Sequence, residues 1–400
     1  MKILQLCIRV PYPPRDGATI AMYNLSESLI TAGASVKALA FNTKKSFVPE
    51  KKIDAGYKKV VNLETVFLDA TVNPLDATLN FFRKNESYNI KRFYSKDFEN
   101  TLIRILKANK FDVVQLEGLF MSPYVDVIRK HSKAKIVMRA HNVEFVIWKR
   151  LADAATNPVK KKYLSFLTKR LRNYEKKMLN KYDAVVPLTN EDAALLKEEG
   201  CTLPVFLLPI GIETKKFGKP VFDAAFNMFH LGSMDWMPNI EAVDWFLKNV
   251  WEQLKKDLPE IKLHLAGSSM PESIKKQADK NLMVYDRIDD AKKFMEDKPV
   301  MIVPLLSGGG MRVKIIEGLA AGKIIISTKI GAEGISYKHG KNILIADSPS
   351  EFISEIKKIY NNIPLMSDMS KEAQQLAQSD FDNEVLGKKL LSFYKELISK

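Results

Sequence analysis

Three consecutive glycines, Gly308, Gly309 and Gly310, follow a buried apolar run and precede a helical pattern. Glycines let backbone N–H groups approach an anion closely, because no Cβ is in the way. The N-terminus of the following helix adds unpaired N–H donors and the positive end of its dipole. Arg312 and Lys314 add two formal charges there, although basic residues oppose the dipole at that end. This conflict with local preference favours an anion-binding site.

Glu317 lies in the same helical run and could accept hydrogen bonds from paired hydroxyl groups, as a ribose presents. The simpler alternative is a glycine-rich turn with solvated charges, in which Glu317 pairs with a neighbouring lysine. We favour the anion site, because Arg, Lys and Glu stand at these spacings at the carboxyl end of an expected strand, where open α/β sheets bind ligands.

The elements that must position this segment alternate between short β-rich runs and amphipathic helical runs, which predicts parallel, doubly wound α/β sheets. The first set of expected strands is Ile3–Ile8, Val36–Phe41, Val113–Leu116, Lys135–Met138 and Ala184–Pro187. The second set is Met228–Leu231, Lys262–Ala266, Leu282–Tyr285, Val300–Leu305 and Ile324–Ser327. Expected helices are Thr19–Thr31, Ile240–Leu254, Ser273–Asp279, Val313–Ala321 and Asn383–Ile398.

A chain of 400 residues is too long for one ordinary domain. Proline and glycine cluster between 203 and 220, which indicates a boundary there. We therefore expect an N-terminal domain over 1–205 and a C-terminal domain over 206–379.

The net charge of +15 is concentrated in the first half of the chain. Residues 1–200 hold 35 Lys/Arg and 21 Asp/Glu, whereas residues 201–400 hold 27 and 26. Between Lys149 and Lys181 there are 11 basic and two acidic residues, on what the apolar spacing predicts to be one amphipathic helix. Such a face is either simply solvated or rests on anionic lipid.

Two cysteines, Cys7 and Cys201, cannot form a disulfide framework, and neither has the neighbours of a zinc site. The N-terminus does not have the form of a signal peptide, and no apolar run is long enough to span a bilayer. These features predict a cytoplasmic protein whose contact with a membrane is at most peripheral. No metal-ligand spacing is evident, and no nucleic-acid-binding motif accompanies the basic half.

The segment from Pro304 to Gly322 resembles the family 4 retaining glycosyltransferases, which have the GT-B fold of two Rossmann-like domains facing across a cleft. Family members carry an E-x7-E pattern here. Glu317 matches the second glutamate, which binds the nucleotide ribose, and Gly309 stands in place of the first. The GGGxRxKxxE form looks like a subgroup in which Arg312 and Lys314 serve the diphosphate.

Other segments resemble the same family. Phe229–Asn239 is similar to the first strand and loop of its C-terminal domain, and Arg139–Glu144 to the loop whose histidine lies against the donor sugar. Arg9–Ala18 resembles the family's first glycine-rich loop. The last helix, 380–400, is expected to cross back to the N-terminal domain, as it does in the family.

The resemblance implies a role for each matched residue. The expected catalytic residues are His141, Arg312 and Lys314. The expected donor-binding residues are Gly17, Gly232, Ser233, Gly308, Gly309, Gly310, Met311, Arg312, Lys314 and Glu317. The expected acceptor-side residues are Arg15, Asp16, Glu117, Asn142 and Glu144.

The implied activity is metal-independent transfer, with retention of configuration, of a sugar from a UDP- or GDP-linked donor to a glycan or lipid-linked acceptor. No cofactor is expected, and bacterial surface polysaccharide synthesis is the implied setting. Two alternatives stay open. One is a non-catalytic sugar-nucleotide-binding subunit, and the other is a sugar-nucleotide epimerase of the same fold.

Overall fold

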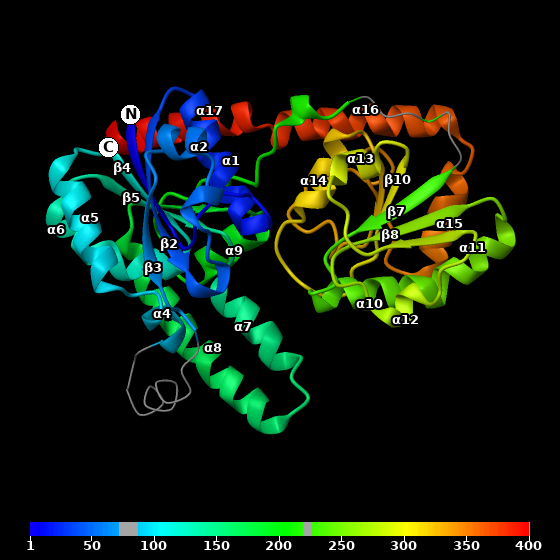
Figure 1. The fold of residues 1–400 in the computed structure, drawn as a ribbon, viewed down its shortest axis with the longest axis horizontal. Helices are drawn as coiled ribbons and strands as arrows, with labels where there is room; N and C mark the ends of the chain where they lie inside the picture. Colours follow the sequence, from blue (N-terminus) through cyan, green and yellow to red (C-terminus); the bar gives the residue numbers. More distant parts are fainter. Residues whose placement is uncertain (72–86, 219–221, 223–225, 400) are drawn as a thin grey trace. The chain divides into compact units, whose positions relative to one another are not determined.

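The computed structural model describes residues 1–71, 87–218, 222 and 226–399. The chain divides into two compact units (Figure 1). Unit 1 comprises Met1–Gly211 and Leu386–Lys400, and unit 2 comprises Ile212–Val385. The segment Leu386–Lys400 therefore belongs with the N-terminal part of the chain, although it lies at the other end of the sequence.

Unit 1 is built on a parallel six-stranded sheet in the order β3-β2-β1-β4-β5-β6. Its strands are β1 (Lys2–Cys7), β2 (Ser35–Thr43), β3 (Glu64–Leu68), β4 (Val113–Glu117), β5 (Lys135–Ala140) and β6 (Ala184–Pro187). Among the residues that the structure describes, its helices of seven or more residues up to β6 are α1 (Gly17–Thr31), α5 (Lys96–Ala108), α6 (Val125–His131), α7 (Glu144–Asp153) and α8 (Pro158–Met178). The chain order of the strands reverses at β1 and β4, and doubly wound sheets bind ligands at the carboxyl ends of such strands.

The two faces of the unit 1 sheet carry separate cores. Leu4 and Leu116 face one core together with Phe98 of α5. Ile3 and Val113 face the other, which also contains Leu390 of α17 (Asn383–Ser399). Adjacent strand residues point to opposite faces, so continuous apolar strands are what a sheet covered on both sides requires. Helix α17 is thus part of the unit 1 core.

Unit 2 has a second parallel six-stranded sheet, in the order β12-β11-β10-β7-β8-β9. Its strands are β7 (Asn227–Leu231), β8 (Lys262–Ala266), β9 (Leu282–Tyr285), β10 (Val300–Val303), β11 (Ile324–Ser327) and β12 (Leu344–Ile345). Among its helices are α10 (Met237–Phe246), α14 (Val313–Ala320), α15 (Pro349–Ile359) and α16 (Ile363–Asp380). Both sheets therefore have the doubly wound order that the alternating pattern predicts.

Two strands were not expected from the sequence, and both lie at sheet edges. In β3 the alternate residues Thr65 and Phe67 are exposed, which removes the signal of a buried apolar run. Strand β12 has only two residues, too few for any periodicity to show.

The prediction of one helix over Lys149–Lys181 is wrong. The chain breaks after α7 at Asp153, and α8 begins at Pro158. The Asn157 side chain caps α8 by accepting from the backbone N–H groups of Val159 and Lys160. Proline at the first helical position suits a helix start, so the local sequence favours two helices here.

Candidate active site

The glycine loop of unit 2 joins β10 to α14 and demands glycine at two positions. Gly308 has φ +103° and Gly310 has φ +82°, a region that side chains rarely adopt. A Cβ on Gly308 would also lie 2.7 Å from ring carbons of Trp236. The loop therefore packs closely on this indole.

Arg312 is held between Trp236 and the glycine loop. Its guanidinium carbon lies 4.7 Å from the centroid of the Trp236 ring, a cation–π contact. Its Nη1 donates to the carbonyl oxygen of Gly309 at 2.5 Å. Arg312 is also the residue that precedes the first turn of α14, which contains no acidic residue. A fixed cation and the N–H groups of a helix start thus meet at one point.

Lys314 and Glu317 form an ion pair one turn into α14. The Lys314 ammonium donates to Oε2 of Glu317 at 2.7 Å. This is the pairing that the sequence offered as the simpler alternative. The other oxygen, Oε1, accepts no hydrogen bond within the described part of the chain. The carboxylate could therefore keep its lysine and still accept from a hydroxyl group.

The loop after β7 supports the glycine loop. A Cβ on Gly232 would lie 2.6 Å from Nδ2 of Asn239, and this amide donates to the carbonyl oxygen of Ser233 at 2.8 Å. The Ser233 hydroxyl contacts that of Ser268 at 2.9 Å. These contacts fix the backbone that carries Trp236.

Met311, which was predicted to bind the donor, is buried at the end of the glycine loop.

In unit 1 a buried carboxylate holds the predicted histidine. Glu117 ends β4 and is fully buried, and its Oε2 lies 2.7 Å from Nε2 of His141 and 3.6 Å from Nη1 of Arg139. Burial opposes ionisation, yet Arg139 and the His141 hydrogen bond hold the pKa of Glu117 below its ordinary value. Because an ionised carboxylate only accepts, Nε2 of His141 carries the proton.

The sequence placed Glu117 on the acceptor side, whereas its burial behind His141 leaves it no surface for an acceptor. Its carboxylate instead contacts Arg139 and His141. Further polar side chains anchor it: Gln5 Nε2 donates to Glu117 Oε1 at 2.7 Å, and Gln115 Nε2 donates to the same oxygen. The hydroxyl of Tyr394, on α17, donates to Oε1 of Gln115.

This buried network was missed in the sequence, although one signal for it exists. Gln5, Gln115 and Glu117 are polar residues inside strands that are otherwise apolar. The strand pairing places Gln5 opposite Gln115, and Glu117 opposite Arg139. Buried polar groups are costly unless they are hydrogen-bonded, so such residues indicate a network.

The first loop of unit 1 caps the start of helix α1. Asp16 caps α1 by accepting from the backbone N–H groups of Ala18 and Thr19, and it pairs with Arg9 at 2.9 Å. Gly17 begins the helix, and a Cβ there would meet nothing within 4 Å. Packing therefore does not require this glycine. The Arg15 side chain is exposed beside it.

Glu144 lies beside a second carboxylate that the sequence did not reveal. It begins α7, shortly after Asn142, and burial with the nearby charge of Glu175 raises its pKa to about 8. Glu175 of α8 accepts from the backbone N–H groups of Glu144 and Phe145, both at 3.1 Å. Burial raises the pKa of Glu175 to about 7. Glu175 lies in the row of apolar residues along α8, and a charged residue at such a position was the signal in the sequence that could have revealed it.

The predicted site residues thus gather at strand ends within each unit. In unit 2 the donor-side residues surround the start of α14, and in unit 1 His141 and its carboxylate stand at the ends of β4 and β5. Within the described ranges, no group of three or more His, Cys, Asp or Glu side chains could hold a metal ion. No described helix is long and apolar enough to cross a membrane.

Two units in one chain, each with a parallel, doubly wound six-stranded sheet, are the arrangement of the GT-B class of α/β fold. Comparison with known families is consistent with this class. The model described as "Glycosyltransferase Family 4" matches residues 15–216, and that described as "Glycosyl transferases group 1" matches residues 225–362. The chain therefore belongs to glycosyltransferase family 4 and is a glycosyltransferase.

Individual relatives match along nearly their whole length. A Klebsiella pneumoniae "Uncharacterized 44.6 kDa protein in cps region" is 24% identical, with 99% of each chain covered. Among solved structures, sucrose-phosphate synthase from Thermosynechococcus elongatus has a TM-score of 0.72 at 16% identity, covering 100% of both chains. Anabaena HepE in complex with UDP-glucose has a TM-score of 0.64 at 12% identity, covering 99% of this chain and 100% of that one.

A third solved structure is a single-residue mutant of TarM from S. aureus, in complex with fondaparinux, alpha-GlcNAc-glycerol and UDP. It has a TM-score of 0.63 at 12% identity, and the match covers 98% of this chain and 100% of that one.

Proposed function

We propose that this glycosyltransferase moves a sugar from a UDP- or GDP-linked donor to a glycan or lipid-linked acceptor, without a metal ion and with retention of configuration. The observation that carries this proposal is the fixed position of Arg312 between Trp236 and the Gly308–Gly310 loop at the start of α14. Such a cation and the helix N–H groups suit a nucleotide diphosphate.

In this proposal the unit 2 site stabilises the leaving group. Arg312, Lys314 and the N–H groups of the first turn of α14 hold the diphosphate as negative charge develops on it. Glu317 accepts from the ribose hydroxyls through Oε1 while Lys314 stays bound to Oε2. The leaving phosphate assists deprotonation of an acceptor that attacks from the same face of the sugar, which retains the configuration.

Gly309 in place of a motif glutamate supports a subgroup assignment. Its carbonyl oxygen accepts from Arg312, so the backbone at this position serves the arginine directly. A carboxylate here would add negative charge beside the proposed diphosphate. We therefore propose that GGGxRxKxxE marks members that bind the diphosphate with basic residues.

His141 is the proposed catalytic residue of unit 1. With Nε2 bonded to Glu117, a neutral imidazole presents Nδ1 as an acceptor for a sugar hydroxyl. Its anchored orientation is what positioning of a sugar requires. The histidine contacts substrate, and Glu117 acts through it.

The comparisons support the substrates proposed here. Solved relatives contain UDP or UDP-glucose, and the Klebsiella relative is named for a cps region. We propose a role in bacterial surface polysaccharide synthesis. We further propose that the basic residues from Lys149 to Lys181 bring the protein to the anionic inner face of the cell membrane.

A panel of UDP- and GDP-sugars, ranked by thermal shift and then assayed for donor consumption, tests this function. A ligand that binds only the folded state raises the unfolding temperature, so the largest shift identifies the donor. Binding without turnover across all acceptors would favour a non-catalytic subunit instead.

A further inference from the structure

The carboxylate of Glu117, at the end of β4, is fully buried, and its two oxygens have different partners. Oε2 lies 2.7 Å from Nε2 of His141. Oε1 accepts from two amide groups, Nε2 of Gln5 at 2.7 Å and Nε2 of Gln115. Hydrogen bonds to the charged form of a carboxyl group favour that form, so the direction in which these amides point decides the state of Glu117.

The direction of the Gln5 amide is set by helix α1. Its Oε1 accepts from the hydroxyl of Ser26 at 2.6 Å, and its Nε2 also donates to the carbonyl oxygen of Met22 at 3.4 Å. This amide therefore keeps its N–H groups toward Glu117 without help from the C-terminal helix.

The direction of the Gln115 amide depends on Tyr394 of α17. Both side chains are fully buried, and the Tyr394 hydroxyl donates to Oε1 of Gln115. Within the described part of the chain no other group donates to this oxygen. Burial raises the pKa of Tyr394, so the hydroxyl keeps its proton and acts as a donor. With its oxygen held in this way, the amide must present its N–H groups to Glu117.

Loss of the Tyr394 hydroxyl would leave Oε1 of Gln115 buried without a donor, which is costly. The amide can regain a donor by turning its oxygen toward Glu117, where a proton on the carboxyl group would satisfy both oxygens. Glu117 is neutral in that arrangement. A neutral carboxyl group accepts more weakly than a carboxylate, so the hydrogen bond that orients His141 becomes weaker.

We propose that Tyr394 is a positioning residue for the transfer reaction. Through Gln115 its hydroxyl keeps Glu117 ionised, and the carboxylate then holds the His141 ring in one orientation. The inference rests on the proposed function only for the contact of His141 with substrate. It gives a residue of the last helix control over a side chain at the end of β5.

The bond between His141 and Glu117 can be observed by NMR. An imidazole N–H that donates to a carboxylate gives a downfield proton resonance that exchanges slowly with water. In the full-length protein labelled with ¹⁵N-histidine, His141→Gln identifies this resonance among those of the five histidines. Tyr394→Phe removes the hydroxyl and keeps the ring, and we expect it to move the resonance upfield or to lose it to exchange.

The same substitution should act on kcat. We expect Tyr394→Phe to lower kcat by at least about fivefold, the effect of one lost hydrogen bond, and to change the KM for the donor by less than about twofold. Absence of the resonance from the wild type, or an unchanged resonance or kcat in the variant, would overturn the inference.

Tyr182→Phe is the matched control. Tyr182 is also buried in unit 1, and its hydroxyl lies 2.6 Å from that of Ser122, outside the network of Glu117. Both variants lose one buried hydrogen bond, so the Tm should fall by a similar few degrees in each. Only Tyr394→Phe should change the His141 resonance and kcat. Equal changes in the two variants would mean a general loosening of the core and would overturn the inference.

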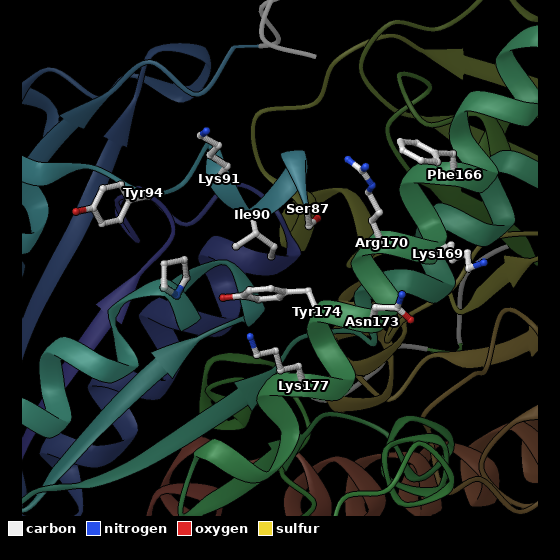
Figure 2. A pocket seen from close by; sticks show the side chains of 11 residues that line it. Ser87, Ile90, Lys91, Tyr94, Phe166, Lys169, Arg170, Asn173, Tyr174 and Lys177 are labelled. Atoms are coloured by element: carbon white, nitrogen blue, oxygen red, sulfur yellow. The ribbon is translucent and has the colours of Figure 1, made fainter. Parts of the chain in front are cut away.

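A second control removes a hydroxyl group from a pocket of the same unit. Tyr174 of α8 lines a pocket between α4 (Tyr88–Lys91) and α8, and none of the side chains that bond Glu117 lines it (Figure 2). Tyr174→Phe should leave the His141 resonance in place and kcat within about twofold of the wild type. A loss as large as that of Tyr394→Phe would contradict the proposal.

Gln115→Met breaks the same link from its other end and provides a second variant if Tyr394→Phe does not fold. It should change the His141 resonance and kcat in the same direction. If Tyr394 acts through Gln115, the double variant should lose no more kcat than the more severe single variant. Losses that multiply would show that the two residues act independently and would overturn the inference.

The resonance is measured without a donor, so the two proposals can fail separately. If it changes in Tyr394→Phe while the wild type consumes no donor, the proposed function is wrong and the control of His141 by Tyr394 stands. If the wild type consumes a donor and Tyr394→Phe changes neither readout, the function stands and this inference is wrong.

Discussion

The Nε2 atom of His141 lies 2.7 Å from Oε2 of Glu117, a fully buried carboxylate that also faces Arg139. The histidine comes from the end of β5, and the glutamate from the end of β4, so parallel pairing of the two strands brings them together. The pair therefore fixes His141, the predicted substrate contact of unit 1, to the sheet of that unit.

Replacing the carboxylate should disturb both orientation and stability. We expect Glu117→Gln to lower kcat by roughly 10–100-fold, because positioning effects of this kind are of that size. It should also lower the free energy of unfolding by about 3 kcal/mol, because it leaves the buried Arg139 charge unpaired. Steady-state kinetics and denaturant unfolding measure the two effects.

A double variant separates these effects. Glu117→Gln with Arg139→Met removes both charges, and it should recover part of the lost stability without recovering kcat. Recovery of kcat together with stability would mean that Glu117 is only structural.

The second prediction concerns Arg312. We expect Arg312→Ala to reduce kcat/KM for the donor by roughly 10²–10³-fold, because charge-assisted stabilisation of a leaving group is worth about 3–4 kcal/mol. Lys371→Ala, which removes an exposed cation of α16, should leave kcat/KM unchanged. An active Arg312→Ala enzyme would remove the anion-site assignment.

Trp236 should matter through Arg312. Trp236→Ala removes the ring on which the guanidinium rests, and we expect a loss of about 1 kcal/mol, or roughly fivefold in kcat/KM. Trp236→Phe should restore most of it, since a smaller aromatic face remains. No difference between the two variants would show that the ring only fills space.

The fourth prediction concerns the nucleotide. Glu317→Ala should weaken UDP or GDP binding by roughly tenfold, because it removes the acceptor for the ribose hydroxyls. Lys314→Ala tests the ion pair separately and should weaken binding of the nucleotide-sugar donor more than binding of the free nucleoside. If the two substitutions weakened binding of the free nucleoside to the same extent, both residues would belong to a structural ion pair.

The fifth prediction follows from the paired carboxyls Glu144 and Glu175. The pKa values of Glu144 and Glu175, about 8 and about 7, exceed the ordinary value of 4.5. Between pH 4.5 and about pH 8 the folded chain therefore holds more protons than the unfolded chain. The contribution of these two groups to the free energy of unfolding is therefore fully present below about pH 4.5 and is lost as the pH rises through about 7 and about 8.

Glu144→Gln should reduce this loss. The Tm of the variant should exceed that of the wild type by a few degrees at about pH 8 and match it near about pH 5. Glu198→Gln, at an exposed position of α9 (Asn190–Glu198), is the control and should keep the wild-type pH dependence. Parallel curves for Glu144→Gln and wild type would contradict the assignment.

The sequence was most informative where a feature is local. Continuous apolar runs predicted ten of the strands, because a run such as Val300–Leu305 is buried by the helices on both faces of its sheet. Strand β3 was not predicted, because the outward side of an edge strand need not be apolar. The glycine loop was also found, since left-handed φ at Gly308 and Gly310 needs residues that are recognisable by type.

Side-chain contacts between distant parts of the chain could not be predicted. The return of the last helix to the N-terminal domain was expected, but the Tyr394–Gln115–Glu117–His141 chain of hydrogen bonds depends on which side chains of α17 meet the unit 1 sheet. The contact of Trp236 with Arg312 depends on how two loops meet. No periodicity in the sequence around Tyr394 or Trp236 indicates which residue each of them contacts.

Donor consumption by the purified full-length protein is the most direct test of the central claim. The assay uses UDP- and GDP-sugars in the presence of EDTA, with product anomeric configuration read by NMR and Arg312→Ala alongside. The account predicts consumption of one donor, a product with the donor's configuration, and a large loss in the variant. Abolition by EDTA, inversion, or tight donor binding without any turnover would contradict it.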